Sequence, residues 1–394
     1  MRRFFMVFSA VILLGSSYSI WALRQPLPVL QPVNVLSTLP KGSAVALTWP
    51  GYGQAAVGAS GYGMLANNGK QSPAPTASVA KVMTALAVLQ KKPLAIGQQG
   101  PSLTIGSQDI AFYNQYVAQG GSVVPVNYGE QLSEYQALQA MLLPSANNMA
   151  DTLASWAFGS VQAYLDYAKG YTAQLKLQSS NFADASGFSA ATTSTASDLV
   201  LLGEAALANP VIAQIVGQSQ ADVPVAGTIH NVNGQLGMDG INGIKTGNTD
   251  QAGGVYLVSG TYTLAGKHSV TIVAVIMGAP SLGRAMQDSL GLLASSQKGF
   301  AENVVVHKGE VVGYYNTSWQ TSANAVAGFD LTSFGWKGSM PKLSLSLRPV
   351  QPPINASHPV GTLTLTSGST TQKTNVTIQN PLPGPTWQWR LLHP

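Results

Sequence analysis

Cysteine is absent from the 394 residues of the sequence. Its absence excludes disulfide bonds, a catalytic thiolate and metal sites built from thiolates. The five histidines lie far apart, without the i, i+4 spacing by which a helix presents two ligands to zinc. We therefore expect no metal and no cofactor, and no histidine stands out as the base of a catalytic triad.

Charged residues are also scarce. Asp, Glu, Lys and Arg make up 9% of the sequence, against roughly a quarter in a typical soluble protein. The net charge of +5 reflects few carboxylates rather than a cluster of basic residues, so we expect no nucleic-acid partner. A surface covered mainly by neutral polar residues favours an extracytoplasmic setting. With 45% apolar residues, the chain is long enough for two or three domains and a sizeable core.

The N-terminus reads as an export segment. Arg2 and Arg3 precede an apolar block, and small residues follow from Gly15. No clear cleavage motif is visible, and Phe4 to Leu23 has about the roughly 20 residues that span a bilayer. Residues 1–24 are therefore either a secretory signal, the interpretation that we favour, or a retained membrane anchor. This segment is also the candidate for any membrane association.

The next residues suggest a linker and then an α/β domain. Residues 25–41 are rich in proline, which is typical of a linker. Apolar runs bounded by Gly and Pro predict strands, and runs with helical period predict helices. We expect strands at 44–49, 54–58, 254–258 and 268–277, and helices from Ser78 to before Pro93 and at 133–143, 149–158, 161–175, 196–207 and 282–294. Strands on both sides of a helical insert predict an α/β domain over residues 42–298 whose sheet is built from both ends.

The pattern changes from Gly299 onward. Residues 343–347 and 363–366 alternate strictly between apolar and polar side chains, and Gly and Pro separate such runs. Period-two alternation predicts a small antiparallel β domain over residues 299–394. It contains no convincing catalytic cluster.

Ser78 and Lys81 form the strongest chemical signal. They are three residues apart at the start of an almost wholly apolar run, so a helix places the hydroxyl and the amine on one face. A serine hydroxyl needs a base before it becomes a good nucleophile. Lysine can be that base if burial lowers its pKa, and an apolar helix supplies the burial. Taken alone, however, the S-x-x-K pattern is short and arises by chance in many chains.

Two further polar motifs follow in order. Ser145-x-Asn147 comes after Pro144 breaks a predicted helix, and Lys245-Thr246-Gly247 lies near the predicted C-terminal strands. Taken singly, the first could be a helix cap and a turn, and the second a solvated strand end. Together with Ser78-x-x-Lys81, these two motifs form an ordered triple. A chance occurrence of all three in this order is far less expected than that of any one motif.

The ordered triple resembles that of the penicillin-recognising serine acyl-transferases, which include penicillin-binding proteins and serine β-lactamases. The segments 126–130, 182–188, 194–199 and 239–249 look similar to the low-molecular-weight D-alanyl-D-alanine carboxypeptidases in particular. The resemblance covers roughly residues 42–297. It implies a β-lactamase/transpeptidase-like α/β domain, followed by that family's β domain.

The resemblance also implies roles for the first two motifs. Ser78 would attack the carbonyl between the last two D-alanines of a peptidoglycan stem peptide, and Lys81 would accept its proton. Ser145 would relay the proton to the leaving amine, and Asn147 would hold the peptide. Water would then hydrolyse the acyl-enzyme on Ser78. β-Lactam antibiotics would acylate the same serine as covalent inhibitors.

The third motif would bind the substrate. Lys245, on an edge strand, would attract the terminal carboxylate and help keep the amine of Lys81 neutral, while Thr246 would donate a hydrogen bond. Gly247 would let the peptide lie against the strand. The backbone N–H groups of Ser78 and Asn248 would form the oxyanion hole.

Other residues receive structural interpretations. Asp184 and Ser186 are expected to cap and turn the chain near the site, and Arg284 to form an ion pair. Asn148 stands where the family often has an acid, and Asn248 where many members have a bulkier or imidazole side chain. These two departures bear on substrate preference and rate.

Two alternatives remain at this point. One is β-lactamase or esterase activity on the same scaffold, although no clear Glu-x-x-x-Asn element of the class A deacylation type precedes Lys245. The other is a non-catalytic cell-wall-binding scaffold protein, which would have no need of both Ser78 and Lys81.

Overall fold

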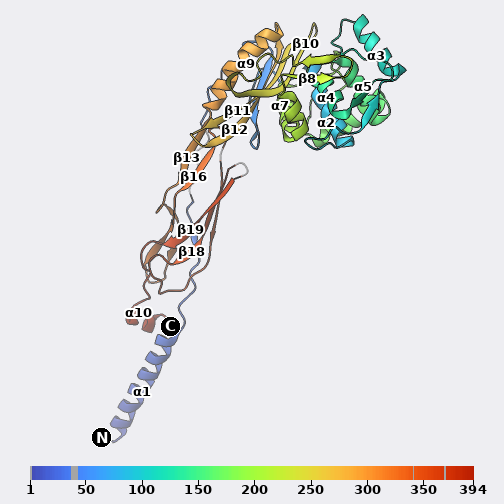
Figure 1. Cartoon of the computed structure of the whole chain (residues 1–394). Coiled ribbons are helices and arrows are strands. Elements are labelled where there is room, and N and C mark those ends of the chain that lie inside the picture. The colour runs from blue at the N-terminus through green and yellow to red at the C-terminus, as the bar shows by residue number, and fades with distance from the viewer. Residues whose placement is uncertain (1, 37–42, 340, 368–369) are drawn as a thin grey trace. The chain divides into compact units, whose positions relative to one another are not determined.

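The computed structural model describes residues 2–36, 43–339, 341–367 and 370–394. The chain divides into two compact units. The larger unit comprises residues 43–301 and 336–338, and the smaller unit comprises residues 1–42, 302–335 and 339–394. Each unit has its own hydrophobic core, and all three sequence motifs lie in the larger one (Figure 1).

A five-stranded antiparallel sheet forms the centre of the larger unit, in the order β10-β11-β12-β2-β3. Its strands are β2 (Gln54–Ala59), β3 (Gly63–Asn68), β10 (Ile241–Thr249), β11 (Gly253–Leu264) and β12 (His268–Ala279). The prediction that both ends of this segment build one sheet is therefore confirmed. Strand β10, which carries Lys245-Thr246-Gly247, lies at an edge.

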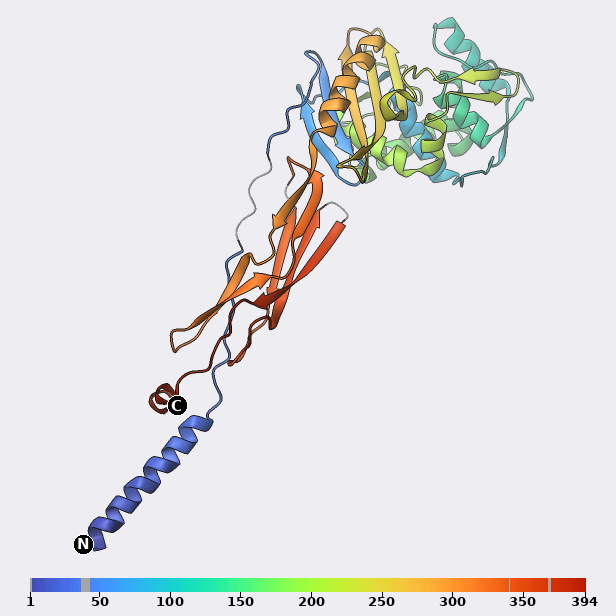
Figure 2. The same ribbon diagram turned by 60° about the vertical axis from the view of Figure 1, so that its left-hand side comes forward.

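Helices cover the sheet and fill the insert between β3 and β10. Helices α7 (Ala196–Ala208) and α9 (Leu282–Gln297) pack on the sheet (Figure 2). The insert also contains α2 (Lys81–Lys91), α3 (Ser107–Ala118), α4 (Glu134–Leu142), α5 (Asn147–Phe158), α6 (Val161–Gln174) and α8 (Pro210–Val216). Helix α2 is buried from Lys81 to Leu89 and packs against α4, α5, α6 and α7. A helix apolar on nearly all sides belongs inside a protein, so the sequence of α2 explains its central position.

Most predicted elements are present, but one expected strand is wrong and several observed elements, among them β3, α3 and α8, were not predicted. The expected strand at 44–49 is wrong: this segment is irregular, and the N–H of Thr48 donates to Ser295 Oγ (2.9 Å) on α9 rather than to a neighbouring strand. Helix α3 was not expected, because its sequence is polar and only Tyr116 on it is buried. A helix with so narrow an apolar face gives little periodic signal.

The smaller unit is an antiparallel β structure, as its alternating sequence predicts. Its six-stranded sheet has the order β1-β14-β15-β19-β18-β17. The strands are β1 (Val33–Asn34), β14 (Val311–Asn316), β15 (Ser322–Ala327), β17 (Lys342–Leu347), β18 (Pro359–Ser367) and β19 (Thr370–Ile378). A separate two-stranded pair consists of β13 (Phe300–Val306) and β16 (Leu331–Trp336). Buried side chains such as Tyr315 and Leu363 form the core.

The N-terminal segment contributes to this smaller unit. Helix α1 (Arg2–Arg24) is followed by residues that carry structure within the stretch expected as a linker. Leu30 is buried in the core and forms a bridge with Val350, and β1 pairs with β14. The end of that stretch, residues 37–41, lies outside the described residues.

A capping box at the start of α4 offers a stability test. The N–H of Gln136 donates to Ser133 Oγ (3.1 Å), and the N–H of Ser133 donates to Gln136 Oε1 (3.0 Å). We expect Ser133→Ala to lower the free energy of unfolding by about 1 kcal/mol, because helix N–H groups lose their partner. Urea unfolding followed by helical circular dichroism measures the change.

The matched control is Ser155→Ala on α5. The buried hydroxyl of Ser155 has no hydrogen-bond partner among the described residues, so its loss should not lower stability. Equal destabilisation by both variants would show that the capping box contributes nothing.

Candidate active site

Ser78 lies in η1 (Ala77–Ala80), a single 3₁₀ turn that leads directly into α2. The side chain of Lys81, the first residue of α2, reaches back to it, and Nζ lies 2.8 Å from Ser78 Oγ. The expectation that the hydroxyl and the amine share one helix face is therefore confirmed. Ser78 is half-buried whereas Lys81 is fully buried, so the hydroxyl is reachable and the amine is shielded.

The turn before Ser78 is held by close backbone packing. Ala77 has a positive φ of 46°, which is unusual for a residue with a side chain. Gly187 passes so close that a Cβ built on it would lie 1.9 Å from the carbonyl oxygen of Ala77. A glycine is required there, because any side chain would push the turn away.

Lys81 Nζ has three neighbours within hydrogen-bond distance. It donates to Asn147 Oδ1 (2.7 Å) and to the carbonyl oxygen of Ser186 (2.8 Å), and the third neighbour is the Ser78 hydroxyl. The first two can only accept, so they use two N–H groups of the amine. A hydroxyl can donate as well as accept. The three neighbours can therefore satisfy a neutral amine. It would donate its two N–H groups to Asn147 and Ser186, and its lone pair would face the hydroxyl proton of Ser78.

Burial lowers the pKa of Lys81 to about 7, while the carboxylates of Asp184 and Asp151 act in the opposite direction. A fully buried ammonium loses its hydration, which disfavours the charged form. Near neutral pH a substantial share of Lys81 is therefore the neutral amine, the form that can accept a proton.

Ser145 and Asn147 lie where α4 gives way to α5. Asn147 is the first residue of α5, and its side-chain oxygen joins it directly to Lys81. Ser145 has a positive φ of 67°, and its hydroxyl is buried without a partner among the described residues. A buried hydroxyl that makes no hydrogen bond is costly unless something binds to it. Ser145 is therefore a free polar group next to the Lys81 cluster.

Asn148, one of the departures from the family pattern, has a structural role. Its side-chain amide donates to the carbonyl of Val124 (3.0 Å) and accepts from the N–H of the same residue (3.1 Å). These paired bonds fix the segment that runs past the start of α5. An ionised acid at this position could accept from the N–H but could not donate to the carbonyl.

The edge strand β10 runs beside η1. A Cβ on Gly247 would lie 3.0 Å from Ala77 Cβ and 3.1 Å from the backbone nitrogen of Ser78, so glycine lets the strand pass closely without crowding the turn. Lys245 and Thr246 are buried on the same strand, and Lys245 Nζ donates to the carbonyl of Thr246 (3.0 Å). Asn248, the next residue, is exposed.

Lys245 is a second buried amine. Burial holds the pKa of Lys245 well below its usual range, and the charge of Lys81 is a second, smaller cause of the same shift. Two buried ammonium groups repel each other, so a proton on one disfavours a proton on the other.

Asp184 organises the loop that supplies the Ser186 carbonyl. Its carboxylate accepts from Ser186 Oγ (2.6 Å), the N–H of Phe188 (2.9 Å) and the Thr192 hydroxyl. The expectation that Asp184 and Ser186 cap and turn the chain is confirmed. Arg284 likewise forms its expected ion pair, with Asp288 on α9 (2.8 Å).

A second carboxylate, Asp151, was missed from the sequence. Tyr116 donates to Asp151 Oδ2 (2.9 Å), and its hydroxyl also lies 3.3 Å from Ser186 Oγ. Burial raises the pKa of Asp151 to about 6. The available signal was an acid within the otherwise apolar run of α5, but its partner Tyr116 comes from α3, which was not predicted.

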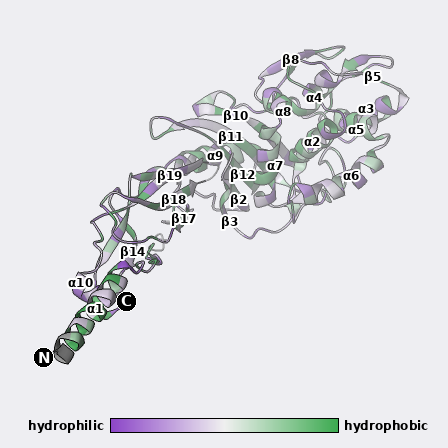
Figure 3. Ribbon diagram, turned by 90° about the horizontal axis from the view of Figure 1, so that it is seen from below, coloured by the Kyte–Doolittle hydropathy of each residue, from purple (hydrophilic) through white to green (hydrophobic). Residues whose placement is uncertain are grey.

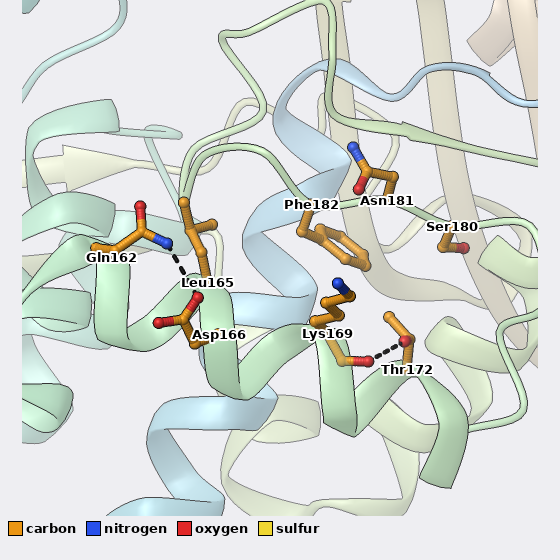
Figure 4. A pocket seen from close by; sticks show the side chains of 8 residues that line it. All are labelled: Gln162, Leu165, Asp166, Lys169, Thr172, Ser180, Asn181 and Phe182. Atoms are coloured by element: carbon orange, nitrogen blue, oxygen red, sulfur yellow. Dashed lines mark hydrogen bonds between the residues drawn. The ribbon is translucent and has the colours of Figure 1, made fainter.

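Another depression lies apart from these motifs, between α6 and residues 180–182 (Figure 4). Asp166 and Lys169 on α6 line it together with Phe182. None of its lining residues belongs to the Ser78, Ser145 or Lys245 motifs. The triple motif, rather than this depression, therefore marks the candidate active site.

Comparison with solved structures supports this fold. The structure resembles penicillin binding protein 5 from Haemophilus influenzae, with a TM-score of 0.59 and 18% identity, covering 88% of this chain and 100% of that one. It also resembles penicillin binding protein 6B from Escherichia coli, with a TM-score of 0.60 and 18% identity, covering 90% of this chain and 100% of that one. The expected fold, a transpeptidase-like α/β domain followed by a β domain, is thereby confirmed.

Sequence comparison gives the family. D-alanyl-D-alanine carboxypeptidase DacA of Escherichia coli (strain K12) is 28% identical over 206 residues, which is 51% of this chain and 49% of DacA. DacC of the same strain is 26% identical over 232 residues, or 55% of this chain and 53% of DacC. The chain thus spans about half the length of these curated relatives. The family model described as D-alanyl-D-alanine carboxypeptidase matches residues 57–281, more than half of the chain. This chain therefore belongs to the D-alanyl-D-alanine carboxypeptidase family.

Proposed function

We propose that the protein is a serine-type D-alanyl-D-alanine carboxypeptidase that removes the terminal D-alanine from peptidoglycan stem pentapeptides. The observation that carries this proposal is the buried amine of Lys81, 2.8 Å from the hydroxyl of Ser78. We assign the reaction to the α/β unit, residues 43–301, because it contains every motif residue. The expected extracytoplasmic location is part of this proposal, since the substrate lies outside the cytoplasmic membrane.

Acylation begins with transfer of the Ser78 hydroxyl proton to Lys81 Nζ. Ser78 Oγ bonds to the carbonyl carbon between the two D-alanines, and the carbonyl oxygen takes up negative charge. The N–H groups of Ser78 and Asn248 are our candidates for stabilising that charge. Their proximity is supported by Gly247, which lies against the nitrogen of Ser78. Such donors are typically worth about 3 kcal/mol each in the transition state.

The tetrahedral intermediate then collapses. The C–N bond breaks, the leaving amine of D-alanine receives the proton that Lys81 took from Ser78, and Ser78 keeps the acyl group. We assign the proton relay to Ser145, because its hydroxyl is buried, unpartnered and two residues from Asn147, which bonds Lys81. Water then attacks the ester carbonyl, with Lys81 accepting a proton from it. The bond between Ser78 Oγ and the acyl carbon breaks, Lys81 returns the proton to Oγ, and the peptide leaves one D-alanine shorter.

Lys245 is suited to recognise the substrate carboxylate. A carboxylate beside it raises the pKa of its ammonium and thereby favours a proton on Lys245. Because a charged Lys245 disfavours a charged Lys81, substrate binding would drive Lys81 toward the neutral form. Binding and activation would be coupled through two buried amines, with Thr246 donating a hydrogen bond to the same carboxylate.

A fluorescent penicillin tests the nucleophile. We expect it to label Ser78 covalently, and we expect Ser78→Ala to lose the label and to reduce D-alanine release from a defined pentapeptide by about 10³-fold or more. Mass spectrometry of the peptide measures the release. The exposed Ser102→Ala is the matched control and should keep both activities.

Retained release in Ser78→Ala would exclude the proposed mechanism. Rapid turnover of the penicillin by the unmodified protein would instead favour the β-lactamase alternative. Peptide binding without either release or labelling would favour the wall-binding scaffold.

The pH dependence tests the base. Since Lys81 must be neutral, the rate of acylation by penicillin should rise about tenfold per pH unit below about pH 7 and level off above it. Asp151→Asn removes a carboxylate that favours the Lys81 ammonium, so the pKa of Lys81 should fall further and the acid limb should move to lower pH. Stopped-flow measurement of acylation gives the profile.

Asp166→Asn is the control for Asp151→Asn, because Asp166 is exposed on α6 and bonds Gln162. It should leave the acid limb unchanged. A flat profile in the unmodified protein, or an acid limb that Asp151→Asn moves to higher pH, would contradict the assignment of Lys81 as the base.

A further inference from the structure

Helix α1 has the properties of a membrane-spanning segment. Its apolar part, Phe4 to Leu23, is about 20 residues long and extends ~30 Å at ~1.5 Å per residue, the thickness of a bilayer core. Met6 to Arg24 contains enough apolar residues to cross a membrane, and Figure 3 shows the helix as mainly hydrophobic. Large side chains such as Met6, Leu13 and Leu14 are each more than half exposed. Water is an unfavourable solvent for such a surface.

A removable signal and a permanent anchor share these properties, but the contacts of the last turns of α1 distinguish them. Ala22 is 1% exposed on a helix that is otherwise open on nearly all sides. Tyr18 donates its hydroxyl proton to the carbonyl of Leu391 (2.8 Å), a residue close to the other end of the sequence. A segment that is discarded needs no contacts with the mature fold.

The partner of these turns is α10 (Trp387–Leu392), a short helix in the same unit (Figure 2). Arg390 of α10 donates to the carbonyl of Gln25, directly after α1. The chain then continues into the core of the smaller unit, where Gln351 Nε2 donates to the carbonyl of Leu27 (2.7 Å) and Leu30 is buried. The end of α1 is therefore tied to the β structure by several independent contacts.

Aromatic and basic side chains gather at this end of α1. Trp21 and Trp387 are each more than half exposed, while Trp389 is packed between Trp319 and His393. Arg24 ends α1. Tryptophan, tyrosine and arginine are the side chains that favour the boundary between lipid tails and water. Residue types and position thus agree with a helix end at a membrane surface.

We propose that α1 is retained as a membrane-spanning anchor and that α10, packed on its outer end, lies in the interfacial layer of the same bilayer. The exposed rings of Trp21 and Trp387 and the exposed side chain of Leu392 contact lipid there. Arg2 and Arg3 remain on the cytoplasmic side, as the positive-inside rule requires. This proposal concerns the smaller unit and does not depend on the reaction proposed for Ser78.

Intact mass and N-terminal peptide mapping of the membrane-bound protein test the anchor. The full chain is expressed with its native N-terminus, and membranes are washed with high salt and then with carbonate. We expect the protein to stay in the washed membranes and to retain the 23 residues of α1. A mature protein that begins anywhere between residue 15 and residue 30 would overturn the proposal.

Fluorescence quenching tests the position of α10. The full-length protein is reconstituted into phosphatidylcholine–phosphatidylglycerol vesicles whose lipids are brominated near the headgroups. We expect part of the tryptophan emission to be quenched, and we expect Trp387→Phe to lose a measurable part of that quenching. The control is Trp336→Phe, because Trp336 is buried against Phe300 and lipid cannot reach it. Equal quenching in the unmodified protein and in Trp387→Phe would show that α10 lies off the membrane.

Discussion

The buried amine of Lys81 is the constraint on which the larger unit depends. An amine that is removed from water loses the hydration of its charged form, so the protein can hold it only as a neutral group or with a full set of partners. The site supplies two carbonyl-type acceptors and one hydroxyl. This combination suits an amine whose lone pair faces Ser78. Strongly shifted pKa values of this kind are concentrated at functional sites, because elsewhere they only reduce stability.

The fold brings together segments that are far apart in sequence. Helix α2 supplies Lys81, the start of α5 supplies Asn147, and the loop held by Asp184 supplies the carbonyl of Ser186. Strand β10 passes on the outside, where Gly247 touches the turn of Ser78. Only the last of these contacts is made by the edge strand of the sheet. The same arrangement explains why positions 187 and 247 are glycines, since Gly187 and Gly247 each lie against the backbone of the turn that carries Ser78.

Much of this could be predicted from residue patterns. The apolar character of α2 requires burial, the spacing of Ser78 and Lys81 requires a shared helix face, and Ser133 and Gln136 form the capping box that their types predict. Strong local signals of this kind depend on few neighbours. The resemblance to a known family predicts that the three motifs form one active site. Hydrophobic periodicity predicts the elements that carry them but not that they come together.

The remainder could not be predicted, because it depends on tertiary contacts. Helix α3 has only a narrow buried face, so the Tyr116–Asp151 pair was not visible. The segment at 44–49 has strand-like residues but bonds to a helix side chain instead of a strand. The burial of Ala22 on α1 arises from α10, more than 360 residues later in the chain, and apolar composition alone gives no indication of it.

The most direct test of the central interaction is the titration of Lys81 itself. Carbon-13 NMR of protein labelled at lysine Cε, with the Lys81 signal identified by its loss in Lys81→Arg, follows the proton on this one amine. A buried base predicts a titration midpoint near 7. A midpoint near 10, the ordinary value for lysine, would mean that the amine is charged at neutral pH and cannot accept the proton of Ser78.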